Sequence, residues 1–214
     1  MQRPYPRGMD RLAPQGLELL FASPLLRFAV REAAALNARL LAEIAAMRRA
    51  SPGLARSNQH GWHSETDFFH RAEPGCAALR THILEALRQA TLRVAPEFDF
   101  AQRALQVEGW VNVNGQGGYN TPHDHPGWAW SGSYYVAQPE ATGRSGMIEF
   151  LDPRTNVAVV TVERAACFLS KAQFRPPAGE IIVFPAYLKH WVYPNEQAEE
   201  RVSVAFNARF APRK

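Results

Sequence analysis

Three histidines carry the most specific chemistry in this sequence. The segment His123-Asp124-His125 places two imidazoles two residues apart, and His190 follows at a distance. On a β-strand His123 and His125 would share one face and could bind one ion, while Asp124 would point to the opposite face. With His190 as a third ligand, the set suits iron, zinc, copper or nickel. Ligands on one side of an ion with open positions opposite are typical of oxygen-activating non-haem iron sites.

Arg201 and Ser203 form a candidate anion site. A planar guanidinium binds a carboxylate through two parallel hydrogen bonds, and a nearby serine hydroxyl can add another. A metal centre next to a carboxylate site suggests a bound 2-oxo acid. The segments that carry the histidines and Arg201 all read as strands, in an order that lets distant strands converge on one pocket. We therefore interpret the histidines as a metal site rather than as solvated strand ends.

The first half of the chain is predicted to be mainly helical. Apolar residues recur every three or four positions over Leu36 to Met47 and over Leu79 to Ala90, the spacing of helices packed along one face. Pro52-Gly53 would end the first helix and Pro74-Gly75 would begin the second. Ser51 to Glu73 is then a long connection of the kind that often has a function. It carries His60, His63 and His70, which could form a second metal site but are expected to be solvated.

From about residue 106 the pattern changes to short strands separated by glycine and proline. Eight strands are predicted, at Val107 to Val113, Thr121 to His125, Ser131 to Ala137, Met147 to Leu151, Val157 to Val162, Glu180 to Phe184, Lys189 to Tyr193 and Arg201 to Ala208. They predict an α+β, mainly β fold: a double-stranded β-helix, the cupin-like jelly roll, with N-terminal helices packed on it. We expect one domain, 1–214, with a mainly helical part, 1–105, and a jelly-roll core, 106–210.

Two details of the strand region stay open in the sequence. Asn112 and Asn114 alternate with valines, so both face either a polar cavity or solvent. The glycines from Asn114 to Gly118 predict a turn, and they lack the lysine and the following helix of a phosphate loop.

Composition restricts the function further. The chain has 214 residues, of which 46% are hydrophobic and 21% charged, as in ordinary globular proteins. The N-terminus lacks an apolar signal segment and no run of about 18 apolar residues occurs, so we expect a cytoplasmic protein without a membrane partner. The net charge of +4 comes from scattered basic residues, which argues against a nucleic-acid partner. Cys76 and Cys167 are expected to be free thiols, and sheet edges or the helices could support a homodimer.

A set of short strings in the second half of the chain carries a family resemblance. The strings are His123-Asp124-His125-Pro126, Ser131-Gly132-Ser133-Tyr134-Tyr135-Val136, Asp152-Pro153, Gly179 to Pro185, His190-Trp191-Val192 and Arg201 to Asn207. Together they resemble a bacterial and phage family of 2-oxoglutarate and iron(II) dependent oxygenases, strongly over residues 107 to 208. The resemblance implies a double-stranded β-helix that holds Fe(II) at its open end, with 2-oxoglutarate and O2 as cosubstrates.

The resemblance also assigns roles to residues. His123 matches the first metal ligand and His190 the distal one. Arg201 and Ser203 match the R-x-S pair that binds the far carboxylate of 2-oxoglutarate. Tyr135, the second tyrosine of its pair, matches a tyrosine that reaches the same carboxylate in related oxygenases; the alternative is an ordinary strand aromatic.

The chain departs from the family at the usual H-x-D motif, which here reads His-Asp-His. Two ligand sets are therefore open. Regular strand alternation favours His123, His125 and His190, whereas a bulge or a strand end would bring Asp124 to the metal in place of His125.

The leading hypothesis is an oxygenase that hydroxylates an unidentified small molecule or peptide and forms succinate and CO2. A zinc-dependent hydrolase on a cupin-like fold is the first alternative, because three histidines and a water also make a catalytic zinc site. That alternative gives no reason for Arg201 and Ser203 on the last strand. The second is a non-catalytic jelly-roll module for small ligands, in which Trp128 and Trp130 form a binding platform.

Overall fold

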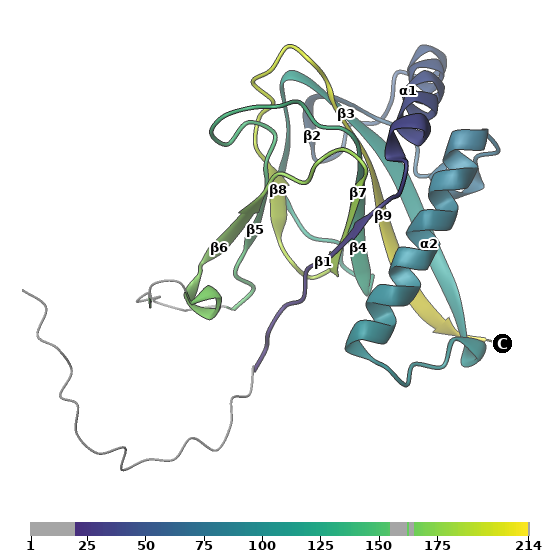
Figure 1. Ribbon diagram of the computed structural model, residues 1–214, viewed down its shortest axis with the longest axis vertical. Coiled ribbons are helices and arrows are strands. Elements are labelled where there is room, and N and C mark those ends of the chain that lie inside the picture. Colours follow the sequence, from purple (N-terminus) through teal and green to yellow (C-terminus); the bar gives the residue numbers. More distant parts are fainter. Residues whose placement is uncertain (1–19, 155–161, 163–164, 214) are drawn as a thin grey trace, which may run out of the picture.

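A curled antiparallel β-sheet with two helices against one face forms the body of the protein (Figure 1). The computed structural model describes residues 20–154, 162 and 165–213. The helices are α1, Ala33–Ala50, and α2, Pro74–Val94. The strands are β1 Leu26–Ala29, β2 Asn58–His63, β3 Arg103–His123, β4 Trp130–Ala137, β5 Ile148–Leu151, β6 Lys171–Phe174, β7 Glu180–Pro185, β8 His190–Val192 and β9 Arg201–Pro212.

The order of the strands makes two walls. The sheet runs β1-β7-β4-β9-β3-β8-β5-β6, and β2 pairs with β3. One apolar cluster joins both helices to the outer face of β3, β4, β7 and β9. A second, smaller cluster lies between the walls and includes Tyr135, Ile148 and Phe184. The predicted α+β, mainly β fold with helices packed on a jelly roll is confirmed.

The helices form where their apolar periodicity predicts them. Leu40 of α1 and Leu79, Ile83 and Leu87 of α2 are completely buried, so one stripe of each helix packs on the sheet. Pro74 occupies the first turn of α2, where its missing N–H costs nothing.

Trp130 belongs to this outer packing layer. Its indole N–H donates to the Thr91 hydroxyl at 3.0 Å, and 7% of the residue is exposed. Trp130 therefore fixes α2 on the sheet, and the binding platform considered from the sequence is wrong for this residue.

Several strand predictions differ from the structure. The two strands predicted between Val107 and His125 are one strand, β3, which pairs with β9 up to Asn114 and with β8 from Asn120. The turn predicted around Gly117 is the place where β3 changes partner, and Gly117 there has a φ of 77°.

The connection predicted over Ser51 to Glu73 contains β2, which covers the bend of β3. Strands β1 and β6 were not predicted, because four residues are too few for their alternation to stand out in the sequence. The strand predicted at Val157 to Val162 lies, except for Val162, outside the described residues.

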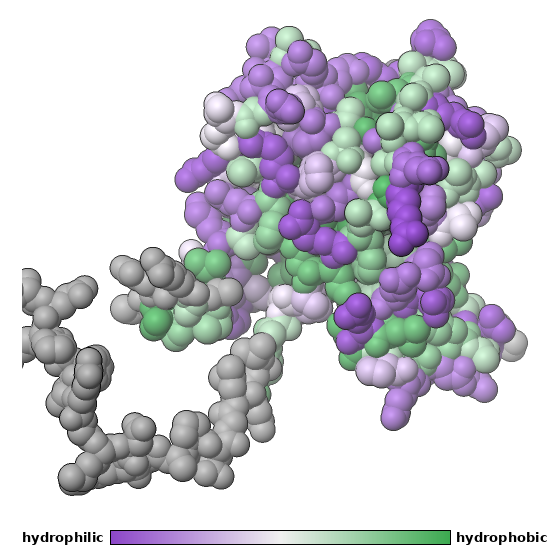
Figure 2. All heavy atoms as spheres, viewed as in Figure 1, coloured by the Kyte–Doolittle hydropathy of each residue, from purple (hydrophilic) through white to green (hydrophobic). Residues whose placement is uncertain are grey.

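Polar and apolar side chains are mixed over the face shown in Figure 2. Neither α1 nor α2 is long and apolar enough to cross a membrane. Cys76 is buried and Cys167 is exposed, and both are free thiols, as predicted.

Candidate active site

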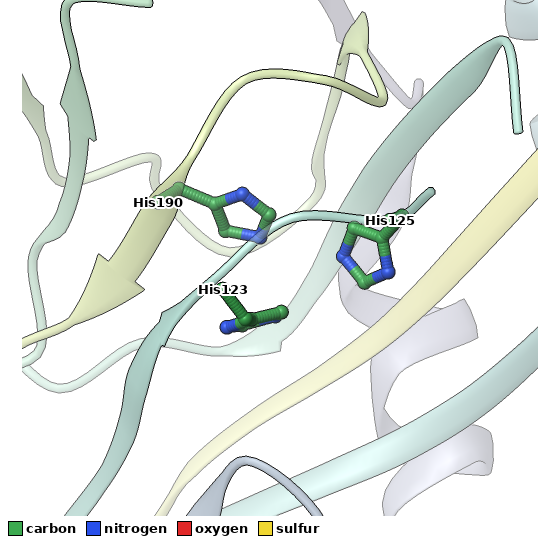
Figure 3. A group of neighbouring side chains, drawn as sticks. All are labelled: His123, His125 and His190. Carbon is green, nitrogen blue, oxygen red and sulfur yellow. The ribbon is translucent and has the colours of Figure 1, made fainter. Parts of the chain in front are cut away.

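The three predicted histidines lie together between the two walls of the sheet. His123 is the last residue of β3 and pairs in register with His190 at the start of β8, while His125 follows two residues later. Figure 3 shows the three imidazole rings grouped around one space. One ring nitrogen from each lies within 4.8 Å of the other two. Two nitrogens bound to one ion at about 2.1 Å are at most about 4.2 Å apart, so a small closure of the rings gives a metal site.

The sequence predicted that a regular strand would place His123 and His125 on one face, but the structure groups them in another way. β3 ends at His123, so Asp124 and His125 lie beyond the strand. The backbone N–H of His125 donates to the carbonyl of Ala186 at 3.0 Å, which holds the chain in place after the strand ends. Asp124 is exposed, whereas His125 is half-buried beside the other two histidines. The geometry thus places His125, and not Asp124, in the histidine group.

Backbone carbonyls fix the orientation of two of the rings. Nδ1–H of His123 donates to the carbonyl of Thr121 at 2.7 Å, and Nδ1–H of His190 donates to that of Leu188 at 2.8 Å. Because these Nδ1 atoms carry the proton, Nε2 of each ring keeps a free lone pair. This is the usual arrangement of a metal-binding histidine.

Burial keeps the three rings neutral. Loss of solvent lowers the pKa of His123, and it lowers that of His125 to about 4 and that of His190 to about 3; the neighbouring imidazoles add to the effect for His125 and His190. Neutral imidazole is the form that ligates metal, so no proton has to leave at pH 7 before an ion binds.

Arg201 is a buried cation in the same pocket. Only 2% of the residue is exposed, and its Nη1 donates to the Ser203 hydroxyl at 3.3 Å. Its Nε has no hydrogen-bond partner, and no carboxylate among the described residues forms an ion pair with it. Burial lowers the pKa of Arg201, yet a guanidinium stays protonated in proteins. An unpaired buried charge is costly, so this group fits an anionic ligand.

Tyr135 lies beside that guanidinium. The Arg201 Cζ is 5.1 Å from the centre of the Tyr135 ring. The Tyr135 hydroxyl is buried without a partner, and burial raises its pKa, so the phenol keeps its proton and can donate it in a hydrogen bond. Arg201, Ser203 and Tyr135 thus provide three kinds of donor at one place, which suits a carboxylate.

One pocket of about 450 Å³, including its open mouth, contains all six predicted side chains. The histidines line one part of it, and Arg201, Ser203 and Tyr135 line another. Apolar side chains of Ile148, Phe184 and Val192 complete the wall. The pocket therefore combines a metal-type ligand set, a carboxylate-type donor set and a partly apolar lining.

Other residues of this pocket were missed as site residues. Asn112 lines it, with a buried Oδ1 that has no partner, so the cavity orientation left open by the sequence is the correct one. Trp110 lines it as well, 5.8 Å from the ring of His125. Asn207 is not among the lining residues, but its amide nitrogen lies 3.3 Å from Nδ1 of the lining residue His125. The signal for these residues was the two-residue periodicity that continues from Arg201 along β9 and is matched on β3.

Trp128 and the exposed histidines of the long connection lie outside the site. Trp128 lies under the guanidinium of Arg209, whose Cζ is 5.0 Å from the indole, outside the set that lines the pocket. His60 and His70 of the long connection are exposed, as predicted, and lie apart from the histidine group. His63 of the same connection is buried and stacks on Trp110, so the solvated position expected for it is wrong.

Several solved enzyme structures share this fold. A prolyl-4-hydroxylase from Pseudomonas putida is 17% identical, with a TM-score of 0.60 over 89% of this chain and 93% of that one. The epimerase SnoN from nogalamycin biosynthesis, solved with Fe3+ and alpha ketoglutarate, is 14% identical, with a TM-score of 0.62 over 90% and 82%. HygX from Streptomyces hygroscopicus, solved with nickel, 2-oxoglutarate and hygromycin B, is 11% identical, with a TM-score of 0.57 over 87% and 82%.

The fold is thus the jelly roll that these enzymes have, and its pocket holds a group of three histidines that could bind a metal ion. Residues 108–207, which include the three histidines, Tyr135, Arg201 and Ser203, match the model of the family described as "Putative 2OG-Fe(II) oxygenase". No sequence among the curated proteins matches the chain. The predicted family, enzyme class and cofactors, Fe(II) and 2-oxoglutarate, are confirmed, against the zinc hydrolase and the non-catalytic module.

Proposed function

We propose that His123, His125 and His190 hold Fe(II) and that Arg201, Ser203 and Tyr135 hold 2-oxoglutarate, for the hydroxylation of a small molecule or peptide in the cytoplasm. The observation that carries the proposal is the buried guanidinium of Arg201, which has no carboxylate partner in the described part of the chain and shares a pocket with three neutral imidazoles. A dianionic cosubstrate would supply the missing counter-charge for Arg201 and for the metal at the same time.

The chain's own groups have separable tasks in this reaction. Arg201 and Ser203 bind and orient the far carboxylate, and the Tyr135 hydroxyl donates to it. The carbonyls of Thr121 and Leu188 hold two ligand rings in the tautomer that leaves Nε2 free. Ile148, Phe184 and Val192 exclude water from the cosubstrate. Bound iron would supply the activation of O2 that couples the decarboxylation of 2-oxoglutarate to oxidation of the substrate.

Three neutral ligands distinguish this site from one with two histidines and a carboxylate. The exposed position of Asp124 and the half-buried position of His125 support the three-histidine set. A metal bound by three imidazoles keeps its full double charge, so binding of metal and binding of 2-oxoglutarate are expected to strengthen each other.

Succinate formation tests the proposal. Protein purified without a histidine tag is supplied with 2-oxoglutarate in air and with Fe(II) or Zn(II), and succinate is measured even in the absence of a substrate. We expect slow succinate formation with Fe(II), none with Zn(II), and none without O2. Equal activity with Zn(II), or none with Fe(II) in a folded protein that has bound the metal, would overturn it.

A further inference from the structure

The polar face that β3 and β9 share extends from Arg201, past the histidine group, to an acidic residue, Glu108. The two strands pair Asn114 with Arg201, Asn112 with Ser203, Trp110 with Ala205 and Glu108 with Asn207. Side chains two apart on a strand share a face, so these pairs follow one another along the inner face of the sheet. Arg201 and Asn207 are six residues apart, which is roughly 20 Å of strand.

Glu108 is the acidic group of this second end. Its Oε1 accepts a hydrogen bond of 2.9 Å from the amide of Asn207, the same amide that lies 3.3 Å from Nδ1 of His125. The Glu108 carboxylate is partly buried, and no lysine or arginine among the described residues forms an ion pair with it. A carboxylate without a cation therefore lies one side chain away from the proposed metal site.

Hydrogen-bond acceptors without donors accompany this carboxylate. The Oδ1 atoms of Asn112 and Asn207 are both buried and unpartnered; the two residues are 6% and 2% exposed, and Asn112 lines the pocket. Buried acceptors of this kind normally have partners, so their absence here indicates a ligand that brings N–H groups.

Along the paired strands, Trp110 occupies the position between the pair with Asn207 and the pair with Asn112. Trp110 follows Glu108 on the same face and lines the pocket. Its ring stacks on that of His63, with centroids 5.5 Å apart and an angle of 12° between the rings, so its orientation is fixed. An indole beside a carboxylate is a favourable environment for an organic cation.

The arginine that follows Asn207 on β9 does not neutralise the charge of Glu108. Arg209, the next residue on that face of β9, is exposed, donates from its Nε to Gln106 at 2.7 Å and lies over Trp128. Its charge is in solvent and therefore screened.

We propose that Glu108, Trp110 and the free amide oxygens of Asn112 and Asn207 bind a protonated amine or guanidinium group of the substrate to be oxidised. The inference rests on the proposed function and names the substrate class for the same pocket. Arg201 lines the pocket, and Glu108 lies on the same sheet face, one register pair beyond the lining residues Trp110 and Ala205. Charge then separates the two ligands: Arg201 binds the dianionic cosubstrate and Glu108 binds a cation, so each ligand is disfavoured at the other's position.

Simple probes test this inference before a substrate is known. The protein is loaded with Zn(II), which has no redox chemistry, and with 2-oxoglutarate. Binding of n-butylamine and agmatine is measured by calorimetry or NMR against neutral N-butylacetamide and anionic butyrate. We expect both cations to bind at least about tenfold more tightly than the neutral and anionic probes, the gain of one charge-assisted hydrogen bond. Equal binding of n-butylamine and N-butylacetamide would overturn the proposal without any mutation.

A charge-only variant supplies the second arm. Glu108→Gln keeps an oxygen for the Asn207 amide and removes only the charge, and Glu97→Gln makes the same change at an exposed position outside the pocket. Cation binding should weaken about tenfold or more in Glu108→Gln and stay at the wild-type value in Glu97→Gln. Wild-type binding by Glu108→Gln would refute the assignment. If the wild-type protein binds 2-oxoglutarate but no cation, this inference alone fails; if it binds no 2-oxoglutarate, the proposed function fails.

Discussion

Replacement of Arg201 separates ligand binding from stability. In a typical buried ion pair, removal of one partner leaves an uncompensated buried charge and lowers the free energy of unfolding by about 3 to 5 kcal/mol. Arg201 has no such partner in the described chain, and its Nε is already unsatisfied in the protein without ligand. Arg201→Met removes the cost of burying the guanidinium and fills part of its volume. We therefore expect the free energy of unfolding of the ligand-free protein to stay constant or to rise.

The same substitution should strongly weaken the binding of 2-oxoglutarate. A desolvated charge pair that loses one member costs about 2 to 5 kcal/mol, which is roughly 30-fold to several thousand-fold in Kd. Arg201→Lys should recover only part of this loss, because an ammonium cannot form two parallel hydrogen bonds with the carboxylate.

Calorimetry without O2 and thermal unfolding measure the two effects in parallel. Wild-type protein should gain a free energy of RT ln(1 + L/Kd) from 2-oxoglutarate at the concentration L, whereas Arg201→Met should gain little. Two results would refute the reasoning: wild-type affinity for 2-oxoglutarate in Arg201→Met, or a loss of stability in the ligand-free variant as large as that of a core cavity. The second result would mean that an acidic partner compensates Arg201 in the free protein.

Three further predictions concern the metal site and the core. Single replacement of His123, His125 or His190 by alanine should deplete iron measured by elemental analysis, while the exposed Asp124→Ala retains it; iron kept in His125→Ala and lost in Asp124→Ala would favour the carboxylate ligand set. Burial lowers the pKa of His125 to about 4 and that of His190 to about 3, from an ordinary value of 6.5. Below about pH 6.5 these histidines therefore bind more protons in the unfolded chain than in the folded protein. Denaturant titrations of the metal-free protein should show stability falling between about pH 6.5 and pH 3, and a histidine contribution that is flat with pH would contradict the lowered pKa values. Leu87→Ala should cost about 2 to 5 kcal/mol in denaturant unfolding, because this fully buried side chain joins α2 to the sheet, without changing iron content; a cost below about 1 kcal/mol would contradict that packing.

The sequence predicted the two helices, the histidine motif and the position of Arg201, because each depends on the spacing of residues that are close in the chain. Both helices follow from apolar residues three and four apart, and Leu79, Ile83, Leu87 and Ala90 are buried as predicted. His123 and His190 were predicted as metal ligands, because imidazoles carried on neighbouring strands can bind one ion. The place of Arg201 on the last strand also followed from the pattern, and its role in 2-oxoglutarate binding stays a prediction.

Long-range pairing accounts for what the sequence did not reveal. β3 changes partner between Asn114 and Asn120, and no local pattern encodes the identity of the strand across the sheet. β2 was missed because Asn58–His63 lacks the β-branched alternation of a strand, and it forms through pairing with β3. Glu108 and Asn207 share a register pair that appears only once β3 and β9 are paired. Alternation placed Asn112 on a face, but only the closed sheet shows that this face is the cavity.

The dependence of 2-oxoglutarate binding on metal tests the central claim most directly, which is that three histidines and Arg201 place both cofactors in one pocket. The Kd of 2-oxoglutarate is measured without O2 for metal-free protein, for Fe(II)-loaded protein, and for His190→Ala with Fe(II) present. The account predicts tighter binding with Fe(II) than without it, and loss of this gain in His190→Ala, because the cosubstrate offsets the charge of a metal held by neutral ligands. The same Kd with and without Fe(II) would contradict it.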